Sequence, residues 1–92
     1  MRQIDIELNA DENRFEITVD GHLCILEFEL DGDVIHMNHV RVPKAVGGRG
    51  IAGDLTRHAL DHARSQGWKV VPNCPYVARW IERHPEYQSL TG

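Results

Sequence analysis

The sequence has few cysteines and no long apolar run. Its two cysteines among 92 residues, Cys24 and Cys74, stand far apart, and no Cys-x-x-Cys spacing that would indicate a zinc ribbon occurs. The N-terminus has no apolar core of a secretory signal, so we expect reduced thiols. No apolar stretch approaches the roughly 20 residues that span a bilayer. These absences predict a cytoplasmic protein with no membrane partner.

The sequence also has no excess of basic residues. Ten Lys and Arg residues stand against fourteen Asp and Glu residues, which gives a formal net charge of −4. This balance weighs against non-specific binding to nucleic acid, although a local cationic pocket for a small anion stays open. A chain of this length supports one modest core, so we expect a single domain over residues 1–92.

The first half of the chain has the period-2 alternation of strands. Apolar side chains alternate with polar ones around Ile4–Leu8, Phe15–Val19 and Leu26–Leu30, and a more central strand is expected over Val34–Val42. Asp20-Gly21 and Asp31-Gly32-Asp33 are turn signals between them. The pattern predicts an antiparallel meander.

The second half changes to helical spacing. Pro43 ends the ladder, and apolar residues from Ala52 to Ala63 predict a helix that stops at Gly67. A short strand, Trp68–Val71, follows, and Pro75 suits the first position of a last helix that Pro85 ends. The order ββββαβα is α+β, and its crossover places the last strand parallel to its partner.

Three features could carry chemistry. The glycine-rich loop 44–50 joins a strand to a helix, so it is either a phosphate cradle supported by Arg49 or a turn whose glycines supply positive φ. Cys74 is the expected N-cap of the last helix, where a thiolate would accept backbone N–H bonds; the alternative is a small buried apolar residue. Tyr76 is a candidate general acid or a packing residue.

The six histidines do not form a convincing metal set. His58 and His62 share one helix face, whereas His36 and His39 point to opposite faces of a strand unless a bulge intervenes. No carboxylate or cysteine completes a ligand group, so we predict no metal. His39 lies just before the glycine loop and is kept as a candidate.

Two segments together resemble a known family. Val40-Arg41-Val42-Pro43 followed by Gly48-Arg49-Gly50-Ile51-Ala52 is similar to the acetyl-CoA loop of the Gcn5-related N-acetyltransferases. Residues 70–77 and 81–87 are similar to the small single-domain, YjdJ-type branch of that superfamily. The resemblance implies a minimal three-layer α/β acyltransferase fold whose sheet opens between the strands that end near Val42 and Val71.

The resemblance also implies a site. Pantetheine would lie against Val40–Val42, the pyrophosphate on the amides from Val46 to Ala52, and the thioester would reach toward Cys74 and Tyr76. The candidate catalytic residues are Cys74, Tyr76 and His39. The candidate acetyl-CoA-binding residues are Val40, Arg41, Val42, Val46, Gly47, Gly48, Arg49, Gly50, Ile51, Ala52, Cys74, Pro75 and Arg79.

Three functions fit these expectations. The first is transfer of acetyl from acetyl-CoA to an amine of a protein, a peptide or a small polyamine, either directly or through Cys74. The second is a non-catalytic CoA-binding or sensing module that acts through a protein partner, because no acidic residue stands out as a base; Glu27 and Glu29 are candidates only if their strand face turns toward the cleft. The third is a structural domain without a ligand.

Overall fold

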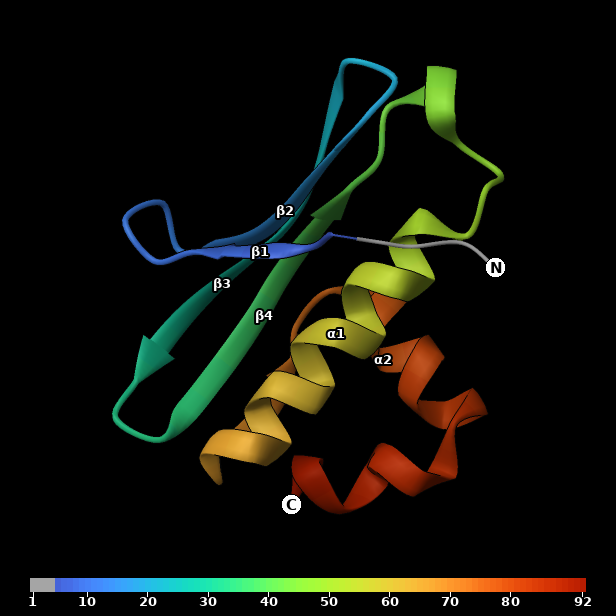
Figure 1. The fold of residues 1–92 in the computed structure, drawn as a ribbon. Coiled ribbons are helices and arrows are strands. Elements are labelled where there is room, and N and C mark those ends of the chain that lie inside the picture. The colour runs from blue at the N-terminus through green and yellow to red at the C-terminus, as the bar shows by residue number, and fades with distance from the viewer. Residues whose placement is uncertain (1–4) are drawn as a thin grey trace.

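The computed structural model describes residues 5–92, and in it one mixed sheet carries a layer of helices (Figure 1). The expected α+β class and the order of elements are confirmed, with two added 3-10 helices. The elements are β1 (Glu7–Asn9), β2 (Arg14–Val19), β3 (His22–Asp31), β4 (Val34–Arg41), η1 (Lys44–Val46), α1 (Ile51–Gln66), β5 (Lys69–Pro72), α2 (Pro75–Arg83) and η2 (Pro85–Thr91).

The sheet has the strand order β1-β2-β3-β4-β5. The first three pairings are antiparallel, and β5 lies parallel to β4, as the crossover through α1 predicts. Asp20 and Gly21 both have positive φ, 50° and 78°, which is the backbone of the tight two-residue hairpin that their sequence predicts. Ile4, at the start of the first expected strand, lies outside the described residues.

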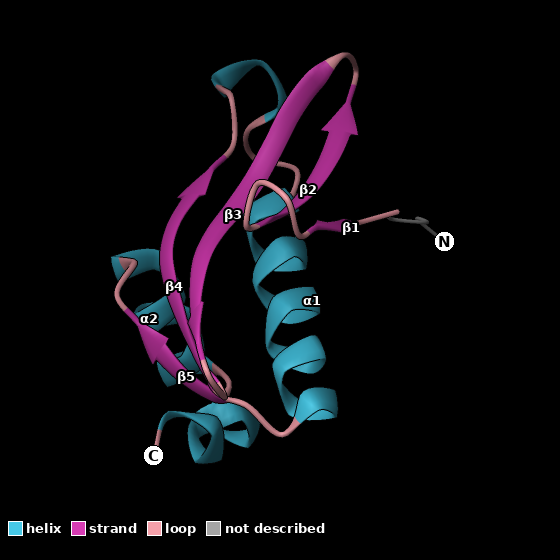
Figure 2. Cartoon of the chain, turned by 90° about the vertical axis from the view of Figure 1, so that its left-hand side faces the viewer, coloured by secondary structure: helices cyan, strands magenta, loops and turns pink. Residues whose placement is uncertain are grey.

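Both long helices pack on the same face of the sheet (Figure 2). Phe15, Leu26 and Ile35 are fully buried beneath α1, and each contributes about 1.5–3 kcal/mol of apolar burial. Val77 and Ile81 of α2 join the same core. Within residues 5–92 no helix covers the other face, which is where the third layer of the expected architecture would lie.

Glycine ends α1 as expected. Gly67 has φ 73°, and its N–H donates to the carbonyls of Ala63 and Arg64. The last α-helix ends just before Pro85 as predicted, but helical structure continues from Pro85 in η2, which folds back against α1. Tyr87 of η2 is buried and donates a 2.7 Å hydrogen bond to Asp61 of α1. No local pattern in the sequence predicted this closing segment.

Candidate functional site

The strands β4 and β5 separate halfway along β4. They pair in register from Val34↔Lys69 to Met37↔Pro72, and the Cys74 N–H donates a last 2.9 Å bond to the Met37 carbonyl. Beyond this point the chain after β5 turns into α2, whereas β4 continues to Arg41. The strands therefore part next to Asn38, within the region where the sequence predicted that the sheet opens.

A β-bulge lies at the point of separation. The β3–β4 register shifts between Glu27 and Phe28, so that Phe28 pairs with Met37 and Glu27 pairs with His39, which leaves Asn38 as the extra residue. His36 pairs with Glu29. The bulge therefore brings His36 and His39 to one face, the exception that the sequence analysis had named.

Two asparagines join the separating strands. Asn73 Nδ2 donates a 2.9 Å hydrogen bond to Asn38 Oδ1, across 35 residues of sequence. We call this pair the vertex, because it marks where β4 and the chain after β5 diverge. Neither asparagine was among the candidate residues predicted from the sequence. A polar residue with low strand propensity in the middle of a strand was the available signal.

The glycine loop leads from β4 into α1. Val46 is buried and anchors η1, and Gly48 and Gly50 have positive φ of 78° and 80°. Gly50 is the N-cap residue of α1, and the Asp54 N–H donates to its carbonyl. The N–H groups of Ile51 to Gly53 belong to the first turn and have no carbonyl acceptor within the helix. The loop therefore has the strand–loop–helix backbone on which the predicted anion cradle depends, and anion binding itself stays a prediction.

Two of the seven amides expected to bind the pyrophosphate already have partners. The Val46 N–H donates to the Pro43 carbonyl at 3.0 Å, and the Gly47 N–H donates to the Lys44 carbonyl at 3.1 Å. These bonds form the 3-10 turn, which the sequence analysis did not predict. An anion bound by this loop would therefore have to take its N–H donors from the stretch after Gly47.

Arg49 is close to the cradle but is paired within the chain. Its Nη1 donates a 2.7 Å hydrogen bond to the Asp20 carboxylate in the β2–β3 turn, and both side chains are largely exposed. The loop that was expected to present a cation to phosphate thus holds it against a carboxylate of the protein.

Cys74 and Tyr76 begin α2. Cys74 is its N-cap residue and Pro75 follows at the first helical position, both as predicted. The Cys74 side chain is only 6% exposed and makes no capping hydrogen bond. The expected stabilisation of a thiolate by helix N–H groups is therefore absent from this geometry, and the thiol packs with the core.

Tyr76 reaches the first turn of α1. Its phenol oxygen lies 3.4 Å from the position that a Cβ on Gly53 would occupy, and Trp80 Nε1 lies 3.5 Å from that position. Burial, followed by the nearby Asp54 carboxylate, raises the pKa of Tyr76, so its proton is retained at neutral pH. Gly53 lets α2 approach the first turn of α1, a role signalled only by a glycine inside a helix.

The other candidates lie at the edges of this region. Arg41 is exposed and pairs in register with Ile25, and Val40 is partly buried against the core. Arg79 is exposed on α2. Within residues 5–92 no group of three potential metal ligands occurs, and no helix there is long and apolar enough to cross a membrane.

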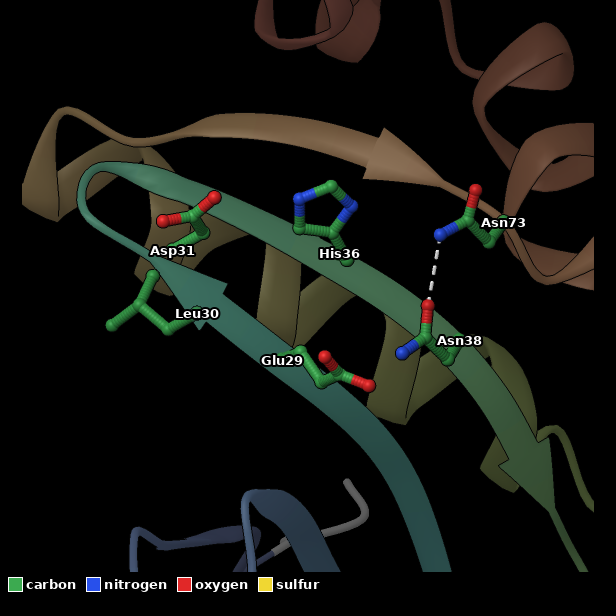
Figure 3. Close-up of a pocket in the computed structure, with 6 residues that line it drawn as sticks. All are labelled: Glu29, Leu30, Asp31, His36, Asn38 and Asn73. Atoms are coloured by element: carbon green, nitrogen blue, oxygen red, sulfur yellow. Dashed lines mark hydrogen bonds between the residues drawn. The ribbon is translucent and has the colours of Figure 1, made fainter.

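A hollow of about 430 Å³ lies on the face of the sheet that carries no helix (Figure 3). It begins at the vertex and extends along β3 and β4 toward their turn. Its lining is formed by Glu29, Leu30, Asp31, His36, Asn38 and Asn73.

Comparison with known proteins places this geometry in a family. Residues 14–90 match the family described as GCN5-related N-acetyl-transferase, and the chain therefore belongs to the GCN5-related N-acetyltransferase family. It is 31% identical over 90 residues to Protein NATD1 of Gallus gallus, covering 92% of this chain and 82% of that protein. Protein NATD1 of Homo sapiens is also 31% identical, with 92% and 80% covered.

The fold agrees with this assignment. A GCN5-like protein of Staphylococcus aureus, solved by NMR, superposes with a TM-score of 0.75 and 26% sequence identity. The match covers 98% of this chain and 89% of that one. The predicted family and its compact α+β fold are thus confirmed.

Proposed function

We propose that this chain binds acetyl-CoA where β4 and β5 separate and transfers its acetyl group to an amine. One observation carries the proposal. The sheet opens at Asn38, between a glycine-rich helix N-terminus on one side and Cys74 and Tyr76 on the other. Family membership makes acetyl-CoA the expected acetyl donor, and this arrangement supports the proposal that it binds here.

The residues present fit such a donor. A Cβ on Gly48 would meet no protein atom within 4 Å, so the outer side of the loop is open to a ligand. The backbone of Val40–Val42 would hold the pantetheine arm, and the amides that follow Gly47 would hold the pyrophosphate. Near the thiol end, Cys74, Pro75 and Arg79 complete the set that the sequence predicted.

Acetyl-CoA, when bound, supplies an acetyl group activated as a thioester. The chain's residues then have two tasks. Tyr76, which keeps its proton, donates it to the departing sulfur. His39 is the candidate to accept a proton from the incoming amine. In the overall reaction the C–S bond of the thioester would break and a C–N bond would form. Of the three ammonium protons, one would stay on the amide nitrogen, one would be balanced by the proton that the thiol gains, and one would pass to solvent.

Titration of the labelled chain with acetyl-CoA tests the binding step. We expect amide shifts in residues 48–53 and 38–42, and mass-detected acetylation of at least one amine in a broad panel. Intact-mass spectra after incubation show whether Cys74 takes the acetyl group. If the loop amides do not respond, the proposed binding site is wrong.

A second candidate is a CoA-binding module without catalysis. The buried, uncapped thiol of Cys74 favours it, because an enzyme that uses this thiol as a nucleophile needs it accessible and activated. Binding of CoA without transfer to any amine in the panel, together with unchanged protein mass, would support this alternative.

A further inference from the structure

The hollow on the helix-free face has two chemically different ends (Figure 3). At the vertex, Asn38 and Asn73 present neutral amides, and Asn73 immediately precedes Cys74 in the chain. Away from the vertex, Glu29 and Asp31 present carboxylates on neighbouring positions of one strand face. The lining contains no Lys or Arg residue to neutralise them.

The spacing of these groups follows from the strands. Glu29 pairs with His36, two residues from Asn38, and Asp31 pairs with Val34, four residues from Asn38. With a rise of about 3.4 Å per residue, the two carboxylates project roughly 7 Å and 14 Å from the vertex along the sheet. The hollow is thus neutral at the vertex and carries two negative charges, those of Glu29 and Asp31, at increasing distance from the vertex.

We propose that this hollow binds a linear aliphatic diamine or polyamine, with one ammonium group against Glu29 and Asp31 and the other amine at the Asn38–Asn73 vertex. The identification of this molecule as the acetyl acceptor rests on the proposed function, whereas its binding does not. The extended methylene chain lies along the sheet beside His36, between Glu29 and the vertex, and the terminal amine points to the place where the strands separate.

The charges of the hollow favour a diamine or polyamine over a monoamine or an amino acid. A monoamine can place its single ammonium against Glu29 and Asp31, but it then has no second amine for the Asn38–Asn73 vertex and loses the hydrogen bonds there. An amino acid adds a carboxylate that Glu29 and Asp31 repel. Because the carboxylates are exposed, the attraction is screened by salt, and binding should weaken steadily as sodium chloride is added.

The first experiment measures binding to the full chain without any CoA. Labelled protein is titrated with cadaverine at low salt and, separately, with pentylamine, which has the same carbon chain and one amine. We expect cadaverine to shift the amides of β3 and β4 around Glu29 and His36. We expect pentylamine to bind about fivefold more weakly, because it keeps the ion pair but has no second amine to hydrogen-bond at the vertex.

Paired variants with equal charge changes locate the site. Glu29→Gln with Asp31→Asn removes both carboxylates of the hollow, and Glu82→Gln with Glu86→Gln removes two exposed carboxylates from the helical side. The first pair should weaken cadaverine binding about tenfold and the second should leave it within about twofold. Circular dichroism of each variant confirms that the sheet is retained.

The outcomes separate this inference from the proposed function. Equal affinity for cadaverine and pentylamine, or equal loss in both variant pairs, would overturn the diamine site even if acetyl-CoA binds. Tight binding of a lysine peptide with no response to cadaverine would also overturn it. Acetyl transfer to cadaverine and to pentylamine is then compared in both variant pairs. If only the Glu29 and Asp31 pair loses the preference for cadaverine, the diamine that binds in the hollow is also the acetyl acceptor.

Discussion

Arg49 in the glycine loop is bonded to Asp20 in the β2–β3 turn, with 2.7 Å between Nη1 and Oδ2. The two residues are 29 positions apart and come from different halves of the fold. A carboxylate and a phosphate both present anionic oxygens that accept hydrogen bonds from a guanidinium, so the Asp20 carboxylate binds Arg49 as a phosphate would. Asp20 is therefore an internal competitor for any phosphate that uses Arg49.

Replacing Asp20 by Asn should tighten CoA binding about two- to fivefold, as expected for release of one exposed ion pair. Asn tolerates the positive φ of 50° at this position, so the turn should be retained. Arg49→Ala should weaken binding by a similar factor. Calorimetry with CoA measures both changes, with Asp11→Asn as a control for lost negative charge. Unchanged affinity in Asp20→Asn would show that the pair does not compete.

The sequence predicted the local features of this fold. Alternating apolar residues indicated β2 to β4, Asp20-Gly21 indicated a two-residue hairpin, and Pro75 indicated the start of α2; each depends on residues close together in the chain. The Arg49–Asp20 pair and the vertex depend instead on residues 29 and 35 positions apart, which no local pattern couples.

The candidate site was predicted in outline by resemblance and corrected in detail by structure. The loop and Cys74 stand at the predicted places, but η1 uses the amides of Val46 and Gly47, and the Cys74 thiol is not capped by helix N–H groups. The first difference arises because a 3-10 turn uses N–H donors that an extended loop would leave available. The second arises because the Cys74 side chain packs with the core.

Tyr76→Phe tests the assigned proton donor. The variant should lower kcat about a hundredfold with little change in KM, because only a proton transferred in the transition state is lost. Burial and Asp54 raise the pKa of Tyr76, so in the native chain the acid stays protonated below about pH 10 and should impose no decline in rate there. Rates against pH for both proteins provide the measurement. If the rate of the native chain falls through neutral pH while a spectroscopic signal shows Tyr76 losing its proton, the assignment is wrong.

Tyr87 gives a stability prediction at a position away from the site. Its hydroxyl donates to Asp61 at 2.7 Å, so Tyr87→Phe should lower the free energy of unfolding by about 1 kcal/mol in urea titrations. Burial, followed by the Asp61 hydrogen bond, raises the pKa of Tyr87. The contribution is therefore fully present below the unfolded tyrosine pKa of about 10 and is lost as pH rises through the folded value.

Tyr76→Phe is the matched stability control, since that side chain is 43% exposed. It should change unfolding far less at neutral pH. If the two variants lose equal stability, the docking of η2 does not depend on the Tyr87–Asp61 bond.

Gly48→Ala tests whether the loop binds a ligand or merely turns. Gly48 has φ 78° and its Cβ would meet no protein atom within 4 Å, so Ala costs roughly 1 kcal/mol of backbone strain and creates no clash in the free protein. Gly67, at the other end of α1, has φ 73° and equally open surroundings, which makes Gly67→Ala a control with the same strain.

We expect similar losses of thermal stability from both variants. Only Gly48→Ala should lower the CoA affinity, by at least about tenfold, because a methyl group there occupies space that the phosphates need. Equal CoA affinity in the two variants would mean that the glycine serves the turn and that the phosphates bind elsewhere.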